Sequence, residues 1–145
     1  MDKMKEVVIS IRSVQDYDED DSMSFEFTTD GMYSFKDGVG RLVYYESEVS
    51  GLPGTRTTVS ISPDEVVLNR EGRLTSCMVF REGKKNAILY DTPYGSACMG
   101  IDTRKIRQRF DEKGGNMELN YILNLEHAVV GKNRLELNVK EIEAF

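Results

Sequence analysis

The chain has 145 residues, 39% of them hydrophobic and 30% charged, a composition that excludes a disordered chain and fits one globular domain. Its 25 acidic residues outnumber its 19 basic residues and give a net charge of -6, which argues against nucleic acid and anionic membranes as partners. Two cysteines, no apolar N-terminal leader and no apolar stretch of about 18 residues predict a cytoplasmic protein that does not cross a membrane.

Alternation of apolar and polar residues with a period of two dominates the sequence, and turn residues interrupt it about every ten residues. The apolar positions of the first two expected strands are Val7, Ile9, Ile11, Met23, Phe25 and Phe27. Asp37-Gly38 then supplies the positive φ angles of a tight hairpin turn. Further turns are expected near 51–54, 62–64, 71–72, 82–83 and 91–95. The clearest alternation runs through the last two strands, over 116–125 and 134–140.

One segment departs from this alternation. In residues 103–110, Ile106 and Phe110 lie four positions apart, as on one side of a helix, and Asp102 or Thr103 is available to cap its first turn. We therefore predict one short helix in an otherwise all-β chain of about ten strands. Closing the sheet removes its two exposed edges, which favours a single antiparallel β-barrel over residues 1–145, with a β-sandwich as the alternative.

Motifs for metal, nucleotide or catalytic sites are incomplete. The acidic run at 16–21 lacks the glycine and glutamate that an EF-hand loop requires, and its flanks are strands. His127 is the sole histidine, which leaves no usual zinc ligand set and only one candidate base for a catalytic triad. Cys77 and Cys98 lie on strands that should not pair, so we expect two free thiols. We expect no metal, no cofactor and no catalytic residue, and therefore favour a protein that is not an enzyme.

Two groups of charged residues have both a functional and a structural interpretation. The only concentrated basic patch consists of Arg104, Lys105, Arg107 and Arg109. It either binds an anion at the mouth of the barrel or forms the solvated face of the short helix. Glu46 and Glu48 are a candidate carboxylate pair for acid–base chemistry. The opposite strand face is more apolar, however, which predicts that both glutamates lie on the surface.

Several segments together are similar to a known family. They are 45–52, Gly54, Thr57-Thr58, Arg70, Gly72, Met78, Phe80, 90–95, Gly100, Thr103, Asn133 and 139–141. In their order and spacing, and most specifically in the Tyr-x-Thr-Pro-Tyr-Gly turn of 90–95, they resemble the YwiB-like proteins. This is a bacterial family of small β-barrels with a lipocalin-like (calycin-like) fold. The resemblance implies a fold, and it gives no residue of this chain a catalytic or binding role.

The expected barrel suggests a binding function. Strand phase places aromatic and aliphatic residues of several strands in the lumen, and Tyr121 adds a hydroxyl among them. Tyr90, Arg70 and Ser76 are expected on the inner faces of their own strands. These four residues predict a lumen that binds a small amphipathic or apolar molecule. The alternative is a barrel filled by its own side chains that acts as a non-catalytic interaction module, including as a homodimer.

Overall fold

In the computed structural model, which describes residues 4–16, 22–46, 54–72, 75–92, 95–125 and 128–142, the described chain forms strands and no helix. The ten strands are β1 (Lys5–Asp16), β2 (Ser22–Lys36), β3 (Val39–Tyr45), β4 (Arg56–Ile61), β5 (Val66–Glu71), β6 (Ser76–Phe80), β7 (Lys85–Thr92), β8 (Gly95–Asp111), β9 (Gly114–Leu125) and β10 (Ala128–Glu141). The all-β prediction and the strand number are confirmed.

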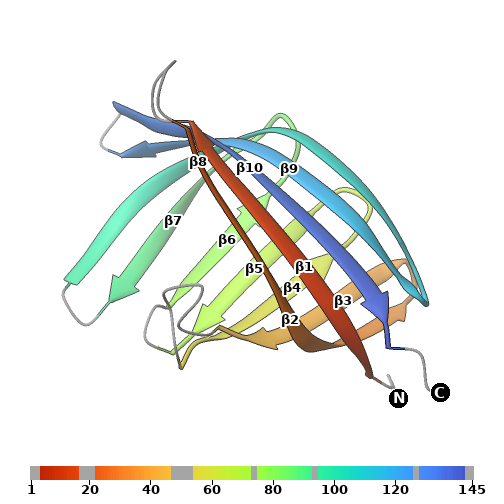
Figure 1. Cartoon of the computed structure of the whole chain (residues 1–145). Helices are drawn as coiled ribbons and strands as arrows, with labels where there is room; N and C mark the ends of the chain where they lie inside the picture. Colours follow the sequence, from red (N-terminus) through yellow and green to blue (C-terminus); the bar gives the residue numbers. More distant parts are fainter. Residues whose placement is uncertain are drawn as a thin grey trace.

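The strands form one antiparallel sheet in the order β6-β5-β4-β3-β2-β1-β10-β9-β8-β7. Each strand pairs with a neighbour in the chain, and the first and last strands pair with each other over ten residue positions from Val7↔Glu141 to Asp16↔Lys132. The sheet therefore curls into a nearly closed barrel with both termini at the same end (Figure 1). This confirms the barrel and rejects the sandwich.

The two outer strands of this order, β6 and β7, are consecutive in the chain and contact each other. Side chains rather than a backbone ladder join this region. Asn86 Nδ2 donates to the Val79 carbonyl oxygen at 3.1 Å, and Gln108 Nε2 donates to the Ser62 carbonyl oxygen at 3.0 Å. The Asn86 bond satisfies a carbonyl at the open edge of β6 and so holds the seam without extending the sheet, while the Gln108 bond joins β8 to the turn between β4 and β5.

Backbone geometry explains two local features of β2. Asp37 and Gly38 have φ values of 53° and 80°, as the expected hairpin turn into β3 requires. At Gly31 a Cβ atom would lie 2.4 Å from Ile9 Cδ1 and 2.7 Å from the Val43 carbonyl oxygen. A side chain does not fit there, so glycine allows the close packing through which β2 passes from β1 to β3.

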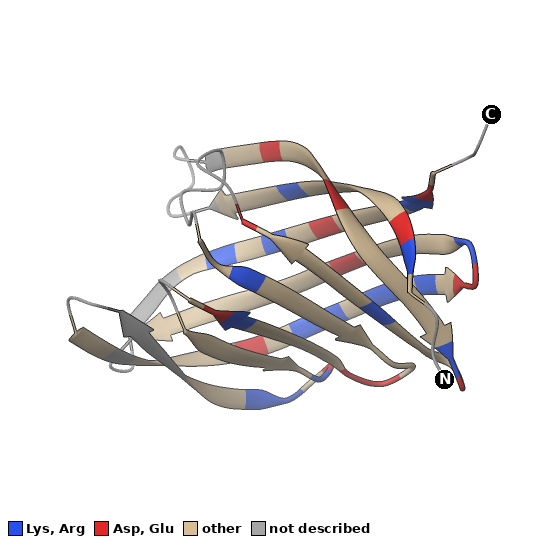
Figure 2. Cartoon of the chain, turned by 90° about the horizontal axis from the view of Figure 1, so that it is seen from below, with Lys and Arg blue, Asp and Glu red and all other residues tan. Residues whose placement is uncertain are grey.

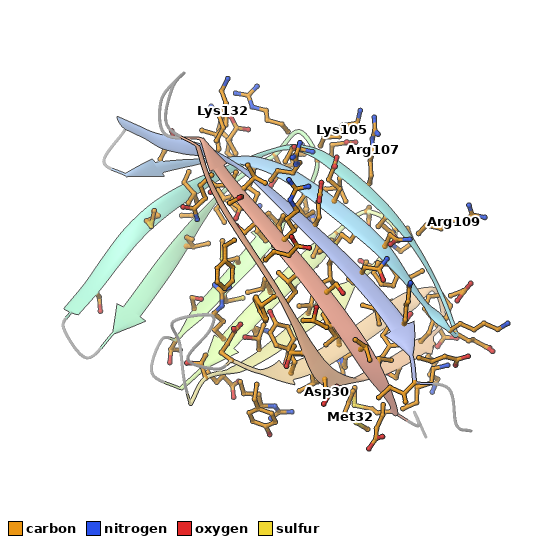
Figure 3. All side chains as sticks on the ribbon, viewed as in Figure 1. Asp30, Met32, Lys105, Arg107, Arg109 and Lys132 are labelled. Carbon is orange, nitrogen blue, oxygen red and sulfur yellow. The ribbon has the colours of Figure 1, made fainter. Side chains whose placement is uncertain are left out.

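The predicted helix at 103–110 is wrong, because this segment continues β8. A spacing of four residues fits a strand face as well as a helix face, and here Ile106 and Phe110 both point inward as alternate positions. The register shifts between Thr103 and Lys105, so Arg104 is the extra residue of a β-bulge. Beyond the bulge, Lys105, Arg107 and Arg109 point away from the barrel (Figure 3). The basic patch is thus a row on a strand.

Most of the core lies toward the end of the barrel where the even-numbered strands finish. Tyr33, Ile61 and Val66 are at most 1% exposed there. The Tyr33 hydroxyl donates to the Asp111 carbonyl oxygen at 2.6 Å, and its ring lies 6.2 Å from that of Phe110. Desolvation by burial, with a smaller effect of the nearby Asp111 carboxylate, raises the pKa of Tyr33 to about 12. We call this region the packed half.

The outer surface is polar. Lys and Arg are interspersed with Asp and Glu over the strands (Figure 2), and exposed ion pairs such as Lys5–Glu141 at 3.0 Å join neighbouring strands. Cys77 and Cys98 are exposed and free, as predicted. No helix among the described residues is suited to crossing a membrane. Residues 17–21, Leu74, Pro93 and His127 lie outside the described residues.

Candidate ligand cavity

A cavity of about 250 Å³ lies toward the opposite end of the barrel, where the odd-numbered strands finish. We call this region the open half. Its apolar wall includes Phe25, Phe27, Met78, Phe80, Leu123 and Leu135. Its polar lining consists of Ser13, Gln15, Tyr44, Glu46, Arg70, Tyr121 and Asn133. The lumen is therefore filled in one half and hollow in the other.

Cross-strand register explains the polar lining, because two rows of polar residues run around the inner wall. The first row crosses β3 to β6 and pairs Tyr44↔Thr57, Thr57↔Arg70 and Arg70↔Ser76. The second row crosses β1, β10, β9 and β8 and pairs Gln15↔Asn133, Asn133↔Tyr121 and Tyr121↔Thr103. Both rows face inward, so the open half carries a polar belt inside an apolar barrel.

Glu46, which was predicted on the surface, is buried. Its side chain is 3% exposed, whereas Tyr45 beside it is 68% exposed. The β3 pattern was therefore assigned to the wrong face. Glu46 Oε1 accepts a hydrogen bond of 2.8 Å from Thr57 Oγ1 and lies 3.9 Å from Arg70 Nε. These partners compensate part of the cost of burying a carboxylate. Glu48, the second member of the predicted pair, lies outside the described residues.

Tyr44 lies in the same cluster. Burial, followed by the negative charge of Glu46, raises the pKa of the Tyr44 hydroxyl above its ordinary value. Arg70 opposes this shift, and the hydroxyl also interacts with Glu46 and Thr57 through hydrogen bonds. Tyr44 therefore stays neutral at physiological pH and donates toward the carboxylate. The cluster has a fixed arrangement of one anion, one cation and neutral hydroxyls.

Of the four residues predicted to bind a ligand, two line the cavity. Arg70 and Tyr121 line the same cavity, and Tyr121 packs edge-on against Phe80 with ring centroids 5.0 Å apart. Ser76 is buried beside Arg70 in register and does not line the cavity. Tyr90 belongs to β7, and its side chain lies outside the described residues.

The chemistry that sequence reasoning missed comes from Glu46, Gln15 and Asn133. Gln15 continues the inward phase of Ile9 and Ile11, which is a signal that the sequence contains. Asn133 lies two positions before Leu135 and is likewise in phase. Glu46 follows Leu42 and Tyr44 in phase, but a carboxylate at such a position contradicts the ordinary rule that charges lie outside.

A second hollow, of about 650 Å³, lies on the outer face of the same wall, because Val14, Ile122 and Arg134 in its lining alternate with the inward-facing Tyr121 and Asn133. Arg104, Lys132 and Arg134 line it, and no carboxylate does among the described residues. Asp102 and Glu136 lie nearby and form ion pairs with Arg104 at 2.9 Å and with Arg134 at 3.3 Å. The outer face of the wall behind Tyr121 is therefore rich in cationic groups, which the sheet separates from the cavity.

Comparison with known proteins supports the family resemblance. The family described as "Domain of unknown function (DUF1934)" matches residues 9–137. The "Uncharacterized beta-barrel protein YwiB" of Bacillus subtilis (strain 168) is 26% identical over 119 residues, 82% of each chain. The crystal structure of ywiB protein from Bacillus subtilis matches with a TM-score of 0.86 and 22% identity, covering 98% of this chain and 96% of that chain. The resemblance to YwiB-like proteins is confirmed, and the solved structure supports the fold.

Proposed function

Given that the chain belongs to the DUF1934 family, we propose that it binds one small amphipathic molecule in the open half of its barrel. The observation that carries this proposal is a 250 Å³ cavity whose wall combines aromatic side chains with the buried Glu46 and the partly buried Arg70. Ligand sites in proteins are mostly apolar concavities in which a few polar groups fix the orientation of the ligand. A solid core would instead fill this volume with aliphatic side chains.

The cellular setting that we propose is the cytoplasm of a bacterium, and the barrel class is lipocalin-like (calycin-like). The YwiB protein that this chain resembles comes from a bacterium, Bacillus subtilis. The free cysteines and the sequence composition favour a reducing compartment. An up-and-down antiparallel barrel around an internal cavity is typical of lipocalins.

The proposal is tested by filling the cavity. Ser13 lines the cavity between Phe25 and Leu135, its register partners, whereas Ser10 on the same strand faces outward. Ser13→Leu places a branched aliphatic side chain in the hollow, and Ser10→Leu is the matched control. We expect an uncharged, environment-sensitive dye to bind the wild type and Ser10→Leu alike, and to bind Ser13→Leu at least about tenfold more weakly.

Circular dichroism and urea unfolding establish that both variants are folded. Equal dye binding to Ser13→Leu would place the dye outside the cavity and contradict the proposal. A folded wild type that binds no dye also contradicts it. That result would favour the alternative function, in which the barrel is a protein-interaction or dimerising module.

A further inference from the structure

At the polar end of the cavity, Arg70 has a buried hydrogen-bond donor without an acceptor among the described residues. Arg70 carries five N–H donors, and its buried Nε has no hydrogen-bond partner among the described residues. Ser76 Oγ, directly beside it in register, is also buried and without a partner there. Glu46 is the carboxylate of this cluster, but its 3.9 Å distance from Arg70 Nε is too long for a hydrogen bond. The Arg70 Nε–H therefore lacks a directly bonded acceptor among the described residues.

We infer that the ligand carries a carboxylate and that Arg70 binds it, an inference that rests on the proposed function. A guanidinium presents its donors in a planar fork that matches the two oxygens of a carboxylate, and such charge-assisted bonds are stronger than neutral ones. The apolar part of the ligand then lies against Phe25, Phe27 and Leu123.

The size of the cavity limits the ligand. A cavity of about 150 Å³ engineered in another protein accepts benzene. The 250 Å³ found in this barrel therefore holds an apolar body of that order together with a carboxylate. The class that fits is a small monocarboxylic acid with one aliphatic chain or one ring.

The surroundings favour an anion over a cation. A ligand ammonium group would add a second cation beside Arg70 and would leave its Nε–H without an acceptor. Glu46 opposes an anion, but hydrogen bonds with Thr57 and with the Tyr44 hydroxyl offset part of its charge.

Three probes with the same eight-carbon chain test the inference on the full-length protein. Octanoate, 1-octanol and octylamine are titrated by calorimetry at pH 7. We expect octanoate to bind about tenfold to a hundredfold more tightly than octanol, and octylamine to bind most weakly. Arg70→Met should reduce octanoate binding to the level of octanol, while Arg41→Met, an exposed arginine on β3, should leave it unchanged.

A second variant controls for misfolding, because Arg70→Met leaves the buried Glu46 carboxylate without the positive charge of Arg70. The double variant Glu46→Gln/Arg70→Met removes both charges and should also lose the preference for octanoate. Octanol binding as tightly as octanoate to the wild type would overturn the carboxylate inference and leave the proposed function intact. Octylamine binding most tightly would overturn it in favour of Glu46 as the anchor. Failure of all three probes to bind would overturn both.

Discussion

The two halves of this barrel are built from the same antiparallel strands, but they differ in the side chains that fill them. In the packed half, Tyr33, Ile61 and Val66 are almost inaccessible to solvent, and the one hydroxyl among these three is bonded to a backbone carbonyl. In the open half, Arg70 and Ser76 have buried polar atoms that lack a hydrogen-bond partner among the described residues. In the packed half the Tyr33 hydroxyl has a partner within the protein, whereas in the open half the buried donor of Arg70 remains available to a ligand.

This difference indicates that one half of the barrel contributes stability and the other is suited to the proposed binding. Burial of apolar side chains stabilises the fold by about 1.5–3 kcal/mol per large residue, and the packed half contributes most of it. A buried polar group without a partner instead costs about 1–3 kcal/mol. Departures from good packing and polar satisfaction in natural proteins concentrate at functional sites. The open half is therefore where we expect the binding that we propose.

The largest expected effect separates the two halves on one strand. Leu119 and Leu123 both lie on β9, but Leu119 is fully buried whereas Leu123 is partly buried and lines the cavity. Leu119→Ala should destabilise the protein by about 2–5 kcal/mol, because it opens a new hole in dense packing. Leu123→Ala enlarges a hollow that already exists and should cost less than about half as much.

Urea unfolding followed by circular dichroism measures both free energies. Leu123→Ala serves as the control for loss of a leucine from β9 in general. Equal losses of stability in the two variants would show that the cavity wall is as tightly packed as the core. That result would remove the distinction between the halves.

The Tyr33 hydroxyl makes the free energy of unfolding depend on pH. Its pKa of about 12 in the folded state, against an ordinary value of 10.0, means that folding favours the neutral hydroxyl. The stabilisation is fully present below pH 10 and is lost as pH rises through about 12, with a maximum of roughly 2–3 kcal/mol. Tyr33→Phe should be less stable than the wild type at pH 8, because the Asp111 carbonyl loses its donor, and should approach it at pH 12.

Unfolding free energies at pH 8, 10 and 11.5 for the two proteins test this expectation. The comparison cancels the titration of lysines and of Tyr44, which both proteins share. A constant difference between the two proteins over this range would mean that the Tyr33 hydroxyl ionises as readily in the folded state as in the unfolded state.

Most of the fold could be predicted from the sequence, because period-two alternation is a local signal that each strand carries by itself. The alternation of Val7, Ile9 and Ile11 and the Asp37-Gly38 turn needed no tertiary information. The segment at 103–110 could not be assigned locally. Ile106 and Phe110 share a face in a strand and in a helix alike, and the Arg104 bulge hides the phase of β8.

The candidate site was predicted in part, and the error at Glu46 shows why. Arg70 and Tyr121 follow the phase of apolar neighbours, so strand phase brought both to the lumen. Glu46 also follows such a phase, but Val43 and Tyr45 made the opposite face of β3 look like the inner one. Only pairing across strands reveals that Thr57 and Arg70 surround the carboxylate, and that pairing is not a local property of β3.

The smallest change in stability is expected for a substitution at Tyr121, and this substitution tests whether the open half binds a ligand. Tyr121→Phe keeps the ring that packs against Phe80, so the free energy of unfolding should change by no more than about 1 kcal/mol. The cavity loses one hydroxyl at its polar end, and octanoate should bind several-fold more weakly. Urea unfolding and calorimetry on the same preparation measure both quantities, with Tyr45→Phe on the exposed face of β3 as the control. A stability loss well above 1 kcal/mol with unchanged octanoate binding would assign Tyr121 to the packed half, because its hydroxyl would then serve the fold alone.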